Sequence, residues 1–498
     1  MQDDVALINR GLALAAAQGL IFYEDEATDR AIAVHAAEVA RHLPPDREQN
    51  LRAVLHEVAL HWRVYDAPRD AALFGMLAEN TAYFGSHAVP PPRTDVVGPG
   101  GVVYRLFPGL GLQWHPLAEF GALNSVVASR DVNLTLQLAQ ALVERGEDTN
   151  GLRFEYFFPF GGPTPWLSGM AQAVAAQALA RAAKLTGDAF LADAAAGAFQ
   201  VVQQQLLTLS SGPWIRLYSF DGEVVLNAQL QTILSLQDYA ALTGDQQAAS
   251  LAEALDTSAK SLFARFDTGA WSLYSLGGLE APLDYQRFVT TILQKLSDRD
   301  PSWAEAAARF KAYLKQAPTL AVAAHSTESW PRPRDGYLDD VAVTFRLSKI
   351  SRVTLSVGAR QVSAIVGRGP HTFHLDPGTL PPGQYAARLA ATDLAGNASS
   401  VDLQPVNVGW DTSAPNVTAL VQGTTLSWFS DDAGTPWLRL RVVLKQGAAT
   451  RVRDLGRRPT SGSFVLVPLQ GTWDATLRAT NSAGYTATVP LGPLPASG

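Results

Sequence analysis

The spacing of apolar residues along the chain changes near residue 330. Before that point, apolar side chains recur at every third or fourth position, which is the pattern of amphipathic helices. Residues 171–188 and 227–245 are the clearest examples, and both end in Gly-Asp, a common helix stop. The same spacing predicts further helices over residues 5–18, 27–43, 48–64, 68–84, 116–146, 189–208, 246–266 and 285–297. Because few β-type runs interrupt them, we expect residues 1–330 to form an all-helical array.

After residue 330, short alternating runs such as VTLSV, HTFHL and YAARLAAT are separated by glycine, proline and asparagine, which is typical of strands and turns. Residues 385–397 align with residues 473–485 at a constant offset of 88, and both segments carry an Ala-Gly turn. A repeat of this length matches one seven-stranded sandwich. The sequence therefore predicts a multidomain α and all-β chain, with Ig-like β-sandwiches over 336–410 and 411–498.

Composition and charge narrow the classes of function. The chain is 47% apolar and 17% charged, which excludes wholesale disorder. It has no cysteine, which excludes disulfides, thiolate metal sites and cysteine nucleophiles. The net charge of −7 is uneven, because residues 1–330 carry 23 basic against 35 acidic side chains and residues 331–498 carry 16 against 11. Neither part has the basic stripe of a nucleic-acid-binding protein, so we expect no nucleic-acid partner.

The sequence also bears on location. It contains no apolar run of about 18 residues, so we expect no transmembrane segment. The first residues show neither a basic leader nor a long apolar stretch, so no signal peptide is visible. Tandem sandwiches of this composition favour an extracellular or cell-surface protein, with a cytoplasmic location as the open alternative. The oligomeric state is open as well.

Four loops between the predicted helices are rich in aromatic, polar and glycine residues. They span residues 104–121, 151–172, 214–229 and 266–287. Such loops gather at one end of an array of helical hairpins. Tryptophan and tyrosine can stack there on sugar rings, while arginine and amide side chains bind hydroxyls and carboxylates. The four loops together predict a glycan-binding cleft, although each aromatic taken singly is also compatible with loop packing.

These loops carry the motifs GLGLQWHPLAEFG, PFGGPTPWLSGMAQ, LYSF followed by VLNAQLQTILSLQDYAALTGD, and FDTGAWSLYSL followed by DYQ. In them the chain resembles the C-terminal domain of the D-glucuronyl C5-epimerase family, over roughly residues 95–315. The resemblance implies an (α/α) toroid-like helical domain that acts on uronic-acid polysaccharide of the heparosan or heparan type. It implies no cofactor and no metal.

The family removes the proton at C5 of a glucuronyl residue and returns one from the opposite face. By motif, its reactive tyrosines fall on Tyr218, Tyr274 and Tyr285. A phenol can donate or accept a proton, but with a reference pKa near 10 it needs a neighbouring cation to act as a base. Animal members have paired glutamates directly before the first tyrosine, where this chain has Arg216 and Leu217, and an arginine three residues beyond the second, where it has Gly277.

Several further residues of these loops are candidate substrate contacts. Arg153 and Glu155 are either an ion pair or substrate contacts, and Arg216 and Arg287 are candidates to replace the missing charge. The aromatic rings are either stacking platforms or loop packing, and the asparagine is either a helix cap or a site residue. The full set is Trp114, His115, Arg153, Glu155, Trp166, Arg216, Asn227 and Arg287.

Three functions remain open from the sequence. The first is a C5-epimerase-like enzyme, although the acidic balance of residues 1–330 opposes a polyanion at long range. The second is a lyase or a glycoside hydrolase; a hydrolase needs two carboxylates, for which the local supply is Glu155, Asp221, Asp238, Asp267 and Asp284. The third is a glycan-binding scaffold without chemistry, which the leucine at position 217 favours.

Overall fold

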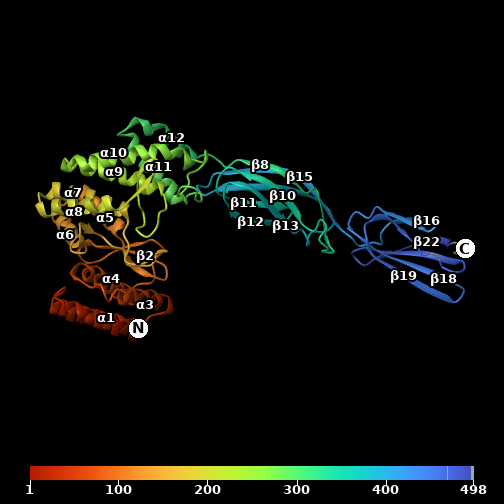
Figure 1. Cartoon of the computed structure of the whole chain (residues 1–498), viewed down its shortest axis with the longest axis horizontal. Coiled ribbons are helices and arrows are strands. Elements are labelled where there is room, and N and C mark those ends of the chain that lie inside the picture. The colour runs from red at the N-terminus through yellow and green to blue at the C-terminus, as the bar shows by residue number, and fades with distance from the viewer. Residues whose placement is uncertain (468, 495–498) are drawn as a thin grey trace. The chain divides into compact units, whose positions relative to one another are not determined.

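The computed structural model describes residues 1–467 and 469–494, and these divide into two compact units, Met1–Ala312 and Tyr313–Gly498 (Figure 1). Residues 468 and 495–498 of the second predicted sandwich lie outside the described residues. The helices are α1 Gln2–Ala17, α2 Tyr23–Ala40, α3 Pro45–Leu60, α4 Ala67–Ser86, α5 Pro116–Ser129, α6 Val132–Val143, α7 Gly169–Thr186, α8 Ala189–Gln204, α9 Leu226–Thr243, α10 Gln246–Leu262, α11 Leu283–Ser297 and α12 Ala304–Tyr313.

The first unit is built from helical pairs. Helix α7 packs against α5, α8 and α9, and α9 packs in turn against α10 and α11. Figure 1 shows α7 beside α8 and α9 beside α10. Helices α7 and α9 are buried on most of their surface, whereas α8 and α10 bury a single side. The unit therefore has an inner row of helices, α5, α7, α9 and α11, with α6, α8 and α10 outside it.

The ends of the inner helices follow from local sequence. The Ser168 hydroxyl accepts a hydrogen bond from the Ala171 amide at the start of α7. Helices α7 and α9 end at Gly187 and Gly244, both with φ of 75°, a left-handed conformation that favours glycine. These two stops confirm the predicted ends of the 171–188 and 227–245 helices.

The helical expectation was wrong in two places. The predicted helix 116–146 is two helices, because Arg130 adopts φ of 62° and the side chain of Asp131 caps α6 by accepting from the Leu134 amide at 3.0 Å. The unit is also not all-helical. The loops fold into a three-stranded sheet and two hairpins, with strands β1 Asp95–Val97, β2 Val103–Phe107, β3 Gly111–Trp114, β4 Glu147–Asp148, β5 Leu152–Arg153, β6 Leu206–Leu209 and β7 Gly212–Ile215.

The second unit is made of strands. They are β8 Leu320–His325, β9 Glu328–Arg332, β10 Val341–Leu347, β11 Ser351–Val357, β12 Arg360–Val366, β13 Gly369–Leu375, β14 Gly383–Asp393, β15 Ala398–Trp410, β16 Val417–Gln422, β17 Thr425–Ser430, β18 Leu438–Gln446, β19 Ala449–Arg458, β20 Ser461–Val465, β21 Trp473–Thr480 and β22 Thr486–Leu494. The sheet orders are β13-β10-β8, β12-β11-β14-β15-β9, β16-β17-β20 and β19-β18-β21-β22.

The repeat seen in the sequence has a structural counterpart. Strands β14 and β15 are joined by a turn through Gly396, and β21 and β22 by one through Gly484, with φ of 94° and 89°. Strands of the first two sheets contribute to one buried apolar core, and strands of the last two to another. The unit is therefore β-rich and two-layered, while its assignment as two Ig-like sandwiches stays a prediction.

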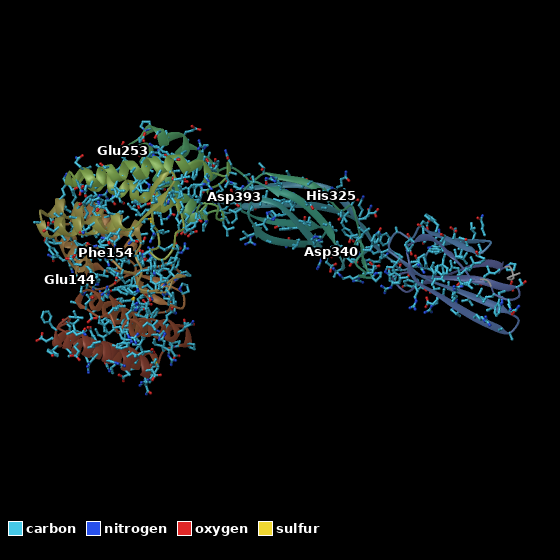
Figure 2. All side chains as sticks on the ribbon, viewed as in Figure 1. Glu144, Phe154, Glu253, His325, Asp340 and Asp393 are labelled. Atoms are coloured by element: carbon cyan, nitrogen blue, oxygen red, sulfur yellow. The ribbon has the colours of Figure 1, made fainter. Side chains whose placement is uncertain are left out.

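The predicted end of the helical domain at residue 330 lies too far along the chain. Strand β8 pairs with β10, and β9 pairs with β15, so residues 320–332 belong to the β sheets. Asp393, which is labelled in Figure 2, forms a fully buried ion pair with Lys349 at 2.5 Å, and the Lys349 ammonium also donates to the Tyr313 carbonyl at 2.8 Å. Among the described helices, none combines the length and apolar character needed to span a membrane.

Helices α2 and α4 bring two carboxyl groups into the interior. Asp29 is 8% exposed and Asp70 is 5% exposed, and neither oxygen of Asp70 has a hydrogen-bond partner among the described residues. Burial and, to a smaller extent, the charge of Asp29 raise the pKa of Asp70 to about 8. Burial likewise raises the pKa of Asp29 to about 7. Both groups therefore favour the neutral acid in the folded protein.

We predict that the free energy of unfolding falls as the pH rises from about 4 to about 8. In that range the folded protein holds protons on Asp29 and Asp70 that the unfolded chain, with ordinary carboxyl pKa values, releases. Asp70→Asn should stabilise the protein at pH 8 by roughly 2–5 kcal/mol and leave it nearly unchanged at pH 4. Urea unfolding at both pH values measures this, with the exposed Asp3→Asn as control. An equal effect at both pH values would contradict the assignment.

Candidate active site

A cavity of about 380 Å³ lies where three inner helices begin. His115 caps α5, Ser168 caps α7, and Tyr285 is in the first turn of α11. Helix N-termini carry partial positive charge and free amides, so this end of the unit favours an anionic ligand group. The lining residues are Arg93, Arg105, Phe107, His115, Leu117, Tyr156, Phe158, Phe160, Trp166, Ser168, Met170, Leu217, Tyr218, Asp284 and Tyr285.

One wall of the cavity is a cluster of stacked rings. Tyr156 and Trp166 pair through both backbones and lie parallel, with ring centroids 4.0 Å apart. The Trp166 ring meets Tyr218 edge-on at 5.7 Å, and Phe220 stacks on Tyr218 at 5.6 Å. A Cβ at Gly162 would lie 2.2 Å from the Phe220 ring, so only glycine permits this approach of two loops. The cluster holds Tyr218 in a defined orientation.

The three tyrosines of the family motifs lie together. The hydroxyls of Tyr218 and Tyr274 are 3.1 Å apart, and the rings of Tyr274 and Tyr285 are 4.9 Å apart at 77°. Burial raises the pKa of Tyr218 to about 12, an effect that the Tyr274 hydrogen bond partly offsets. Burial and the two neighbouring phenols also raise the pKa of Tyr274. Both of these phenols therefore hold their protons at neutral pH.

The cations of the cavity are Arg93 and Arg105, which were not among the predicted contacts. Arg93 pairs with Asp284, and both side chains are exposed. Arg105 donates to Asp95 through two nitrogens, at 2.7 and 2.8 Å, from neighbouring strands β2 and β1. Arg105 lies inside the first aromatic loop and could have been proposed from it, whereas Arg93 precedes every motif and carries no signal in the sequence.

Only part of the predicted binding set lines the cavity. His115 and Trp166 do so. The His115 Nδ1 accepts from the Ala118 amide, and burial lowers the pKa of its ring to about 3, so the imidazole is neutral. Trp114 is 1% exposed, and its indole donates to the Glu155 carbonyl at 3.1 Å. Trp114 therefore packs in the core and is no stacking platform.

The proposed Arg153–Glu155 ion pair does not form. Glu155 is bound instead by Arg69 of α4, whose Nε donates to it at 2.8 Å and whose terminal nitrogen donates at 3.2 Å. Arg153 donates to Gln204 of α8 at 3.3 Å. Neither Arg153 nor Glu155 lines the cavity. The reason is their place on a hairpin strand and just after it, which turns them toward α8 and α4.

Arg216, Asn227 and Arg287 also lie outside the cavity lining. Arg216 donates to the Ser219 carbonyl of its own loop at 3.5 Å. Asn227 is buried in the first turn of α9, one residue inside the helix, so it is not the cap. Arg287 is exposed on α11. None of these three is placed to replace the charge that the family motif loses.

The position expected to carry the family's glutamate does face the cavity. Leu217 is 5% exposed and lines it beside Tyr218. Gly277, at the other departure, adopts φ of 74°. Of the five carboxylates considered for hydrolysis, Asp284 alone is in the lining. The other four have partners elsewhere. Glu155 pairs with Arg69, and Asp267 pairs with Arg309. Asp238 pairs with two arginines, and Asp221 accepts a hydrogen bond from the Glu223 amide. In the described part of the chain, no three His, Asp or Glu side chains are placed to hold a metal ion.

The family model described as D-glucuronyl C5-epimerase C-terminus matches residues 149–311. These residues are similar to the C-terminal domain of that family. The matched range contains Tyr218, Tyr274 and Tyr285 but not the first aromatic loop, which the resemblance had included. No curated protein matches the sequence.

Solved structures share weaker likeness with the chain. The endoglucanase Cel10, a family 8 glycosyl hydrolase from Klebsiella pneumoniae, is 16% identical with a TM-score of 0.34, over 44% of this chain and 75% of that one. A D-mannose isomerase is 12% identical with a TM-score of 0.31, over 41% of this chain and 59% of that one.

We predict that Glu155→Ala destabilises the protein by roughly 1–3 kcal/mol, because it removes one partner of a mostly buried ion pair. Arg153→Ala, on the adjacent hairpin, should change the free energy of unfolding by less than about 1 kcal/mol. Urea unfolding of both variants measures the difference. Equal destabilisation would contradict the separation of these two residues into different contacts.

Proposed function

We propose that the protein is a glucuronyl C5-epimerase-like enzyme acting on uronate-containing polysaccharide of the heparosan or heparan type. The observation that carries this proposal is a contacting group of three tyrosines at one cavity: Tyr218 and Tyr285 line it, and Tyr274 contacts both of them. The match of residues 149–311 to the D-glucuronyl C5-epimerase family model supports it. The aromatic wall suits a sugar ring, and the helix N-termini suit its carboxylate.

The chemistry needs a base on one side of C5 and an acid on the other. A phenolate takes the C5 proton, and the electron pair moves into the carboxylate to give an enolate. A second phenol then donates its proton to the opposite side of C5. Cations near the carboxylate stabilise the added negative charge, and Arg93 and Arg105 are the ones that line the cavity.

The environments of the tyrosines favour different roles. Tyr218, with its pKa raised to about 12, holds a proton at neutral pH and fits the acid. Its hydroxyl is within hydrogen-bond distance of Tyr274, so the second phenol can pass on a proton after donation. Tyr285 contacts Tyr274, follows Asp284 in the chain and lines the same cavity as the Arg93–Asp284 ion pair, and it is assigned as the base.

A binding protein without chemistry is the second candidate. Leu217 occupies the cavity wall where the family motif has a glutamate, and a leucine transfers no proton. A lyase shares the first step with the epimerase, while a hydrolase is disfavoured because a single carboxylate, Asp284, lines the cavity. An (α/α) toroid closure, Ig-like sandwiches and an extracellular location remain part of the proposal.

Incubation with heparosan in D₂O tests the reaction. We expect deuterium at C5, some inversion to iduronate and unchanged chain length. Tyr285→Phe should lower exchange at glucuronate by roughly 100-fold or more, because the base is lost. Tyr218→Phe should keep exchange at glucuronate but lose inversion. The exposed Tyr23→Phe serves as control.

Other products would contradict the epimerase. An unsaturated uronate would indicate a lyase, and new reducing ends would indicate a hydrolase. Glycan binding with no exchange in the wild type would indicate the binding protein. Unchanged exchange in Tyr285→Phe would overturn the assignment of the base.

We predict that Leu217→Glu raises the rate of C5 exchange by roughly tenfold or more, because a carboxylate at this wall supplies the missing proton-transfer partner. Leu217→Gln has nearly the same size without an ionisable group and should give no increase. Deuterium incorporation into heparosan, measured by NMR for both variants, checks this. An equal rate in both variants would show that the carboxylate is not what the reaction lacks.

A further inference from the structure

A second cavity, of about 750 Å³, adjoins the first. Arg105 and Leu117 line both, so the two are adjacent. The second cavity runs along the inner sides of α5, α7, α9 and α11, toward their C-terminal ends. A ligand held at the tyrosines therefore has room to extend along the inner row of helices.

Basic side chains gather in the second cavity. Arg181 of α7 and Arg299, just after α11, both bind Asp238 of α9, with the Arg299 nitrogen at 2.5 Å. The Gln177 amide donates to the same carboxylate at 2.5 Å. Arg181 also donates to the Asn124 amide oxygen at 2.7 Å. The Asp238 carboxylate thus holds the guanidinium groups of Arg181 and Arg299 close together. Their remaining N–H groups can bind further hydrogen-bond acceptors.

The cluster around Asp238 carries more positive than negative charge. Asp238 neutralises one of the two guanidiniums, and the exposed Lys295 has no ion pair among the described residues. Four basic and two acidic side chains line the whole cavity, although residues 1–330 carry 23 basic and 35 acidic ones. The cavity lining therefore has a net positive charge, although residues 1–330 as a whole have a net negative charge.

A plainer account is that these cations stabilise helix C-termini, where the helix dipole is negative. Lys184, in the last turn of α7, fits that account on the outside of the cavity. The account does not explain why two arginines from different helices converge on one carboxylate. Lys295, in the last turn of α11, fits the same account, but unlike Lys184 it lines the cavity.

We propose that Arg181, Lys295 and Arg299 form an anion-binding subsite for a carboxylate or sulfate group on the same glycan chain, beyond the uronate at the tyrosines. This inference rests on the proposed function and narrows the substrate to an acidic oligomer. A single uronate would not reach both cavities. Binding at such a subsite weakens with salt, because the Debye length is about 8 Å at physiological ionic strength.

Calorimetric titration with a heparosan hexasaccharide, an N-sulfated heparosan hexasaccharide and a neutral glucan hexasaccharide tests the subsite. We expect the wild type to bind the acidic hexasaccharides and not the neutral one. Lys295→Gln should weaken that binding by about fivefold, and the double variant Arg181→Gln with Arg299→Gln by more. Lys184→Gln, on the same helix but outside the cavity, should bind as the wild type does. The two acidic ligands distinguish a carboxylate subsite from one that prefers sulfate.

Lys295 is exposed and without an ion pair in the described chain, so its replacement leaves the fold intact even where the double variant unfolds. Equal affinity of the wild type and Lys295→Gln for both acidic ligands would overturn the subsite, as would a failure of the wild type to bind either. The D₂O exchange assay reports the proposed reaction separately. If the wild type exchanges deuterium at C5 and Lys295→Gln binds the hexasaccharides with unaltered affinity, the proposed reaction stands and the proposed subsite is wrong. If Lys295→Gln binds the hexasaccharides more weakly but the wild type shows no exchange, the proposed subsite stands and the proposed reaction is wrong.

Discussion

The burial of α7 and α9 on nearly all sides is the constraint on which the helical unit depends. Each helix has to be covered by neighbours on both flanks and on its outer side, so the chain returns through an outer helix before it lays down the next inner one. This alternation makes the inner helices run in the same direction. Their N-termini, and the loops that lead into them, therefore meet at one end.

The candidate active-site residues lie at that end of the helical unit. The loops bring aromatic rings, Tyr218, Tyr285 and two arginines around one cavity, with Tyr274 in contact with both tyrosines, while the helices supply amides and dipoles. The opposite ends of the same helices carry Arg181 and Arg299 around Asp238. A single packing arrangement thus gives the unit two adjacent cavities that contain arginine side chains, and Arg105 lines both.

Much of this organisation could be predicted from the sequence, because helix periodicity, glycine stops such as Gly187 and the 88-residue repeat are local signals. The grouping of Tyr218, Tyr274 and Tyr285 was also predicted, from motifs. Side-chain direction was not. Trp114 and Trp166 both lie within aromatic loops and look equivalent in the sequence, yet the first faces the core and the second faces the cavity. The pairing of Glu155 with Arg69 joins residues 86 positions apart, and no local pattern reveals it.

The neutral acids between α2 and α4 give the fold an alkaline limit. Folding keeps Asp29 and Asp70 protonated well above the pH at which a free carboxyl ionises, so each step toward higher pH strains this corner of the unit. Proton abstraction by a phenol gains from the same step, since more of the phenol becomes phenolate. A rise in pH therefore lowers the stability of the unit while it favours the phenolate, and both effects act within one unit of about 300 residues. The upper end of the working pH range would then be set by the interior of the first four helices, far along the chain from the tyrosines.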